Sequence, residues 1–245
     1  MAERLCLFEK SGAESSGTEQ KGCENVAVKL EVWGDYACFS RPEFKTERMS
    51  YEVMTPSAAR GLLEAVFWHP GLRWQIDRIH VCAPIRFTNF RRNEVESVLS
   101  ARNAKTVMEK GTGALYLNAA ADIQQRAAMM LRDVHYVIDA HFEMTDRAAP
   151  GDNPGKFQEM ITRRASRGQC YHQPYFGCRE CPAHFRLCPE IPQCPEELKG
   201  QRELGWMLYD LDYSDLEQIH PRFFRAELRD GVLEIPDWNS EEVRG

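Results

Sequence analysis

The stretch VHYVIDAHFEM, residues 134–144, alternates apolar and polar side chains along its whole length. A period of two residues is typical of a β-strand that buries one face and exposes the other. Tyr136, Ile138 and Phe142 belong to the apolar face of this pattern. We therefore predict a half-buried strand here, and the rest of the fold is built outward from it.

A helix is predicted to follow this strand. In NPGKFQEM, residues 153–160, Asn153 can cap a helix and Pro154 fits its first turn. Arg167 would be the last helical residue, because Gly168 is a suitable stop. One apolar stripe runs along this helix at the spacing i, i+3, i+4 and i+8. It consists of Phe157, Met160, Ile161 and Ala165.

Two strands and a helix are predicted on the N-terminal side. Residues 26–33, VAVKLEVW, alternate in the same way as 134–144 and predict a half-buried strand. In TPSAARGLLEAVFWHP, residues 55–70, Thr55 can cap a helix that ends before the final proline. Residues 74–87 return to a strand pattern.

The segment between these elements and the strand at 134–144 is more polar than its neighbours. Residues 88–117 are polar and contain the turn sequence KGTG, which predicts an extended hairpin arm rather than core. AAADIQQRAAMMLRD, residues 119–133, is rich in helix-forming residues and predicts a short helix.

The C-terminal third begins with an irregular segment. Residues 169–204 are rich in cysteine, proline and glycine and show little periodicity. GWMLYDLDY, residues 205–213, predicts a strand. RFFRAELRDGVLEIP, residues 222–236, predicts a hairpin around Asp230 and Gly231, a pair typical of a type I′ turn.

Without the insertion, the core order is β-α-β-β-α-β, which predicts an α+β, ferredoxin-like (RRM-like) fold. RNA-recognition modules share this arrangement, although a fold alone does not determine a function. We divide the chain into a flexible tail over 1–25 and a core over 26–204 with its insertion at about 88–117. Residues 205–245 would supply the last core strand and the C-terminal hairpin.

Charge favours local rather than general binding of a polyanion. The net charge of −6 argues against indiscriminate nucleic-acid binding, which depends on excess positive charge. The cations nevertheless cluster on predicted loops and helix ends, where a polyanion would find them. The three groups are Arg41, Lys45 and Arg48; Arg91 and Arg92; and Lys156, Arg163, Arg164 and Arg167.

The expected compartment is the cytoplasm. No apolar run approaches the ~20 residues that a membrane-spanning helix needs. The first 25 residues are rich in serine, glycine and glutamate, and they lack the basic start and apolar stretch of a secretory signal.

Nine cysteines in such a compartment are expected to be thiols or metal ligands. The densest group is Cys178, Cys181, Cys188 and Cys194. A structural zinc site usually draws its ligands from two close pairs, and only the first pair has that spacing. We predict an irregular loop with free thiols and no metal, with a zinc site as the alternative.

Four long blocks of sequence carry a more specific signal. The first block starts with VWGDY and covers residues 32–70, and the second starts with IDRIH and covers 76–95. The third starts with QQRAAMML and covers 124–144, and the fourth is DNPGKFQ, residues 152–158. Together they resemble the CRISPR-associated (Cas) family-five proteins of subtype I-C, members of the RAMP superfamily. The resemblance extends from Val26 to the C-terminal hairpin.

The resemblance implies a ferredoxin-like domain with a hairpin thumb and a C-terminal antiparallel β extension. It implies a subunit of the type I-C Cascade complex that binds the 5′ handle of the crRNA and cleaves the pre-crRNA repeat hairpin without metal or another cofactor. The implied partners are crRNA, pre-crRNA and the backbone and large Cascade subunits. Target DNA would be contacted only through the complex, and no membrane is implied.

The catalytic pattern of this family is only partly present. The family carries a Tyr or His at the end of the first helix and a Lys-His pair after a glycine. Lys156 matches the lysine, but Phe67 and Phe157 occupy the other two positions. His69, two residues beyond Phe67, is the candidate substitute because a histidine titrates near neutral pH. The alternative is a crRNA-capping subunit of Cascade that does not cleave.

The candidate RNA-binding residues are cations and amides for phosphates and base edges, and aromatic rings for stacking. The structural alternative for the aromatic residues is hydrophobic packing. The full set is Tyr36, Phe39, Arg41, Phe44, Lys45, Arg48, Tyr51, Phe67, Arg91, Arg92, Asn93, Gln124, Gln125, Arg126 and Phe157.

Overall fold

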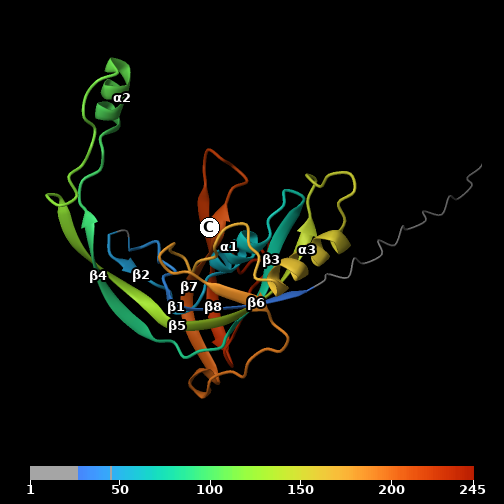
Figure 1. The fold of residues 1–245 in the computed structure, drawn as a ribbon. Helices are drawn as coiled ribbons and strands as arrows, with labels where there is room; N and C mark the ends of the chain where they lie inside the picture. Colours follow the sequence, from blue (N-terminus) through green and yellow to red (C-terminus); the bar gives the residue numbers. More distant parts are fainter. Residues whose placement is uncertain (1–26, 45) are drawn as a thin grey trace, which may run out of the picture.

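The computed structural model describes residues 27–44 and 46–245 (Figure 1). The predicted tail over 1–25 and the candidate Lys45 lie outside these residues. The described elements, in chain order, are β1 Val28–Ala37, β2 Arg48–Met49, α1 Pro56–Val66, β3 Leu72–Val81, β4 Phe87–Val95, α2 Ala101–Lys110, β5 Ile123–Met144, α3 Pro154–Ser166, β6 His184–Leu187, the 3-10 turn Glu196–Leu198, β7 Gln201–Asp212, β8 His220–Arg229 and β9 Val232–Glu234.

The core confirms the predicted α+β, ferredoxin-like class. Four antiparallel strands lie in the order β6-β1-β5-β3, and α1 and α3 lie on the same side of them (Figure 1). The half-buried strand predicted over 134–144 is the C-terminal part of β5, at the centre of this sheet. Its apolar face meets the helices, and Ile138, Leu63 and Ile161 are all buried in one core.

The fourth core strand is β6 and not the segment 205–213 that the sequence predicted. β6 pairs with β1, whereas residues 205–213 lie almost wholly in β7, which pairs with β8. The error has a physical cause, because β6 has only four residues and buries little more than Phe185 and Leu187. So short an alternation does not stand out within a loop rich in cysteine and proline.

The helix predicted over 119–133 is also wrong. Residues 119–122 form a turn, and residues 123–133 form the N-terminal half of β5, which pairs with β4 over 123–131. Glutamine, alanine and methionine favour helices intrinsically, but pairing with a partner strand overrides that weak preference. Asp133 has a positive φ of 53°, yet the register of β5 with β1 is the same on both sides of it.

The predicted arm is a two-stranded ribbon of β4 and β5 that leaves the core (Figure 1). Its tip holds α2, a helix that the sequence did not predict. Ser100 caps this helix and Gly111, with φ of 64°, ends it. The KGTG sequence therefore terminates a helix instead of forming the turn of a hairpin.

The C-terminal extension continues the sheet through β9, β8 and β7. Asp230 and Gly231 both have positive φ, at 47° and 75°, as the type I′ turn requires. This confirms the predicted hairpin. In the part of the chain described here, no helix is both long and apolar enough to cross a membrane.

Candidate active site and RNA-binding surface

The C-terminal end of α1 and the first turn of α3 meet in the aromatic core. Phe67 follows α1, Phe157 belongs to α3, and their ring centroids lie 5.8 Å apart. Their exposed fractions are 1% and 0%. No RNA base can reach either ring, so the prediction that these two residues stack on bases is wrong. Each belongs to the apolar stripe of its helix, which faces the sheet.

Lys156 and His69 lie on either side of Asp152. Lys156 Nζ is 2.7 Å from Asp152 Oδ1, and His69 Nε2 is 3.8 Å from Oδ2. The aspartate side chain is only 3% exposed, while the lysine and histidine side chains both reach solvent. One carboxylate thus binds the Lys156 ammonium group and lies close to the ring of His69, which comes from a distant part of the chain.

Asp152 is well suited to stay charged. The hydrogen bond from Lys156 lowers the pKa of its carboxyl group, and so does a second hydrogen bond from the backbone N–H of Ala149. Because a lowered pKa favours the charged form, the carboxylate is present throughout the neutral range. It can therefore keep Lys156 in place at the pH of the cell.

The ring of His69 is fixed on two sides. The backbone N–H of Gly71 donates to its Nδ1 at 3.0 Å, and the ring packs on Phe157 at 4.8 Å between centroids. A neutral imidazole whose Nδ1 accepts a hydrogen bond carries its proton on Nε2. The exposed nitrogen of His69 is therefore a hydrogen-bond donor. Gly71 is needed here, because an added Cβ would lie 2.8 Å from the Cα of Ala148.

Lys156 also lies at the N-terminus of α3. Its backbone N–H donates to the side chain of the N-cap, Asn153, at 2.9 Å. The first turn of a helix carries partial positive charge, which adds to the field of the ammonium group. An anionic group approaching His69 and Lys156 would meet both contributions.

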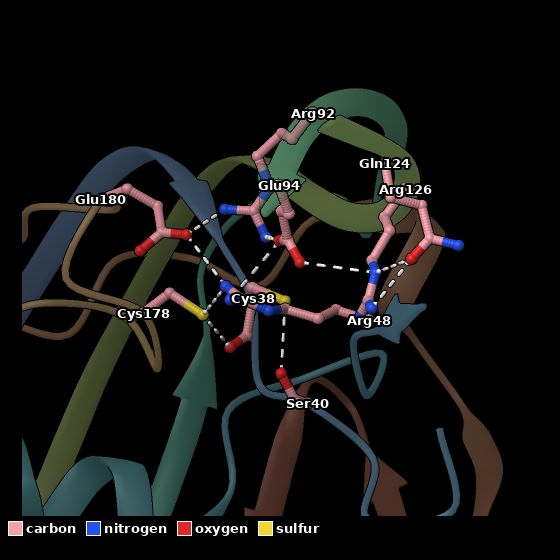
Figure 2. Close-up of polar contacts among 9 residues, drawn as sticks. All are labelled: Cys38, Ser40, Arg48, Arg92, Glu94, Gln124, Arg126, Cys178 and Glu180. Carbon is pink, nitrogen blue, oxygen red and sulfur yellow. Dashed lines mark hydrogen bonds and ion pairs between the residues drawn. The ribbon is translucent and has the colours of Figure 1, made fainter. Parts of the chain in front are cut away.

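A second cluster lies at the base of the arm, where three arginines from three strands converge (Figure 2). Arg48, Arg92 and Arg126 belong to β2, β4 and β5. They meet the carboxylates of Glu94 and Glu180, which the sequence analysis did not single out. Arg126 also donates to the Gln124 side chain at 3.0 Å.

The remaining arm candidates face the other way. Successive residues on a strand point to opposite faces, so Arg91 and Asn93 lie across the ribbon from Arg92. Asn93 pairs with Gln125 in the ladder, and Arg92 pairs with Arg126. Arg91, Asn93 and Gln125 are exposed on their face. The ribbon therefore presents polar side chains to both of its sides.

The four candidate aromatic residues before α1 separate into two pairs. Phe39 and Tyr51 are buried, so the prediction that they stack on bases is wrong. The hydroxyl of Tyr51 accepts a hydrogen bond from the backbone N–H of Leu208 at 3.2 Å, which ties this loop to β7. Tyr36 and Phe44 are exposed and remain available for stacking.

The remaining cation before α1 is Arg41, which covers the ring of Tyr51. Its guanidinium carbon lies 4.4 Å from the ring centroid. This contact is a cation–π interaction that shields the edge of the core. Arg41 is only partly exposed, so part of this side chain serves packing.

The four cysteines of the predicted loop lie in different surroundings. Cys178 and Cys181 form a turn against Cys38. Cys188 follows β6, and Cys194 lies beside Gly231. Among the described residues, no group of three or more His, Cys, Asp or Glu side chains could hold a metal ion. The zinc alternative therefore finds no site in this part of the chain.

Sequence reasoning missed three acidic residues in these clusters. Asp152 could have been found, because it lies four residues before Lys156, a spacing at which opposite charges pair. Glu94 and Glu180 gave no such signal. Each meets arginines from other strands, and only the folded sheet brings those arginines close.

The chain is similar in sequence to proteins of a known family. The family model described as CRISPR-associated protein (Cas_Cas5), in its Cas5d form, matches residues 27–236. A protein of Mannheimia succiniciproducens, named CRISPR pre-crRNA endoribonuclease Cas5d, is 48% identical over 222 residues, or 89% of this chain and 98% of the relative. A Thermus thermophilus protein of the same name is 38% identical over 234 residues, covering 88% and 94%.

Two solved structures share the fold. A crystal structure of a CRISPR-associated protein superimposes with a TM-score of 0.63 at 17% identity, covering 90% of this chain and 97% of the other. A functionally uncharacterized protein of Streptococcus mutans gives 0.62 at 19% identity, with 90% and 98% covered. At such identities the likeness supports the architecture alone.

Proposed function

The chain belongs to the Cas5d family of CRISPR-associated proteins, and we propose that it is a pre-crRNA endoribonuclease that works without metal. Its substrate is the repeat hairpin of the precursor RNA. After cleavage it keeps the 5′ handle of the crRNA as a subunit of the type I-C Cascade complex, beside the backbone and large subunits. Both curated relatives carry the endoribonuclease name.

The observation that carries the proposal is that Lys156 and His69 both lie beside the carboxylate of Asp152. Lys156 lies at the family's lysine position, and Asp152 holds its ammonium group 2.7 Å away. The family's tyrosine or histidine at the end of the first helix is missing, and so is the histidine of its Lys-His pair. Phe157 stands in place of the histidine of that pair, and the ring of His69 lies directly against Phe157. His69 thus brings an imidazole back to the same neighbourhood from another part of the chain.

These groups match the needs of RNA cleavage through the 2′-hydroxyl. The 2′-hydroxyl gives its proton to water as its oxygen attacks the adjacent phosphorus in line, and the phosphorane that forms carries extra negative charge. The P–O5′ bond then breaks, which leaves a 2′,3′-cyclic phosphate and a 5′-oxygen that takes a proton from water. The Lys156 ammonium neutralises that charge, and His69 Nε2–H donates a hydrogen bond to one of its oxygens. Lys156 and His69 act by positioning the RNA and stabilising charge and not by transferring protons, so we expect turnover to be slow. An enzyme that keeps its product needs to act only once on each RNA.

The RNA lies across the arm and the loop before α1. Arginines at the arm base contact phosphates, which sets the position of the RNA without reading its sequence. Asn93 and Gln125, on the opposite side of the ribbon, can read base edges. Tyr36 and Phe44 are the exposed rings on which unpaired bases stack.

A second candidate function is capping of the crRNA handle without cleavage. It is favoured by Phe67 and Phe157, because both stand where the family pattern has proton-handling side chains and both are buried. In that case another protein would process the precursor.

Incubation of the purified protein with its host's repeat stem-loop RNA in EDTA separates the two functions. Cleavage should give a 5′ fragment that ends in a 2′,3′-cyclic phosphate. His69→Ala should slow it by about 10²-fold, the lower end of the effect of removing one hydrogen bond to the developing oxyanion. His220→Ala, which removes an exposed histidine on β8, should leave the rate unchanged. Tight binding of an intact stem-loop would overturn the nuclease and leave capping.

A further inference from the structure

Two guanidinium groups at the arm base share one carboxylate oxygen. Arg48 Nη1 is 2.9 Å from Glu180 Oε1, and Arg92 Nη1 donates to the same oxygen (Figure 2). Two cations held this close repel each other unless an anion lies between them. The geometry therefore defines a site for one anionic group, which the side chain of Glu180 fills.

The surroundings of this site carry further positive charge. Glu94 Oε1 is 3.4 Å from Arg92, and Glu94 Oε2 is 3.8 Å from Arg126. Three arginines thus face two carboxylates, which leaves one net positive charge in the cluster. All three arginine side chains are partly exposed, so a ligand can reach them from solvent.

Glu180 differs from Glu94 in how it is held. Glu94 belongs to β4, the strand that also carries Arg92. Glu180 is exposed on the turn Cys178–Cys181, which closes with a hydrogen bond from the N–H of Cys181 to the carbonyl of Cys178 at 2.9 Å. Its own backbone N–H and then Arg92 lower the pKa of its carboxyl group. Glu180 is thus a charged group on a surface turn, held by ion pairs.

We propose that Arg48 and Arg92 form a binding site for one RNA phosphodiester, and that Glu180 occupies this site in the free protein. Two non-bridging oxygens of a phosphate can accept from both guanidinium groups at once. Exposed ion pairs contribute little stability, so RNA displaces the Glu180 carboxylate at small cost. The inference rests on the proposed function in taking RNA as the polyanion, and it adds an internal competitor to the RNA surface.

The competitor has a use at this position. Two arginine side chains this close would repel each other without an anion, and a fully open pair would attract any nucleic acid. Glu180 holds the two arginines in place, and it weakens the binding of any RNA that contacts the protein through its phosphates alone. RNA that also fits the rest of the surface would then be preferred over RNA that does not.

Poly(U) binding measures this directly, because a phosphate site does not depend on base sequence. Glu180→Gln removes the competing charge and should tighten poly(U) binding by about two- to fivefold, the range of an exposed ion pair. The slope of log K against log salt should become steeper by roughly 0.7, the value for one additional phosphate contact on a single strand. Thermal melts verify that the variant is folded.

The matched control is Glu203→Gln. Glu203 forms an exposed ion pair with Arg225 at 3.0 Å, between β7 and β8 and away from the arm. This substitution changes the net charge equally, so it should reproduce neither the tighter binding nor the steeper slope. In an Arg92→Ala background, Glu180→Gln should lose most of its effect, since the site then lacks one of its two cations.

If Glu180→Gln binds poly(U) no more tightly than the wild type does, the proposal is overturned. Glu180 would then only hold the arginine side chains in position. An equal gain for Glu203→Gln would overturn it as well. Parallel titration with the repeat stem-loop separates this test from the proposed function. Loss of repeat preference with a retained Glu180→Gln effect would contradict the function and leave the phosphate site standing.

Discussion

Lys156→Ala is expected to slow cleavage of the repeat stem-loop by about 10²- to 10³-fold, the usual effect of removing one group that stabilises transition-state charge. The ammonium group stands beside His69 and at the N-terminus of α3, where the phosphorane would form. RNA affinity should change by no more than about threefold, because one cation among many phosphate contacts is lost. Single-turnover rates at saturating protein isolate the chemical step.

Lys199→Ala is the matched control for this experiment. Lys199 is also a surface lysine, 55% exposed against 50% for Lys156, and it pairs with Glu196 as Lys156 pairs with Asp152. Its removal should leave the rate unchanged. Lys156→Arg keeps the charge but moves it, and should recover part of the rate. A Lys156→Ala enzyme that cleaves within threefold of the wild-type rate would place the chemistry elsewhere.

Phe157→Ala is expected to destabilise the protein by about 3–5 kcal/mol, the range for removing a fully buried aromatic side chain. Phe157 is 0% exposed, and its ring contacts the rings of Phe67, Phe142 and His69 at centroid distances of 5.8, 6.2 and 4.8 Å. Urea denaturation followed by tryptophan fluorescence measures the change in the free energy of unfolding.

Phe44→Ala serves as the comparison, since its ring is 47% exposed. It should change stability by less than about 0.5 kcal/mol, while weakening RNA binding if the ring stacks on a base. The opposite pattern, with Phe157→Ala stable but poor at binding RNA, would mean that Phe157 is a stacking surface after all.

The elements that were predicted well have strong local causes. The second half of β5 alternates over eleven residues, α1 and α3 both begin with a capping residue and a proline, and the last hairpin carries Asp230 and Gly231. Each pattern is decided by residues close together in the chain. Such local preferences agree with the tertiary structure, so the predicted elements are the ones that form.

The failures have non-local causes. The first half of β5 is a strand because β4 pairs with it, although its own residues favour a helix. β6 is too short to show a period, and only its pairing with β1 makes it a core strand. Neither fact can be read from the residues of the segment itself.

The candidate site was predicted in part for the same reason. The family resemblance nominated Lys156 and residue type nominated His69, and the fold brings them together. Residue type also nominated Phe39, Tyr51, Phe67 and Phe157 for RNA binding, and all four are buried. An aromatic ring is equally suited to a core and to a base, so sequence chemistry alone does not separate the two roles. Burial decides.

Both cleavage and capping require that this chain recognise its own repeat RNA, and a titration tests that claim most directly. Labelled repeat stem-loop and a scrambled RNA of equal length are titrated with the protein at physiological salt and in EDTA. The repeat should bind at least about tenfold more tightly than the scrambled RNA, a difference of about 1.4 kcal/mol. Equal affinity for the two RNAs would contradict that claim.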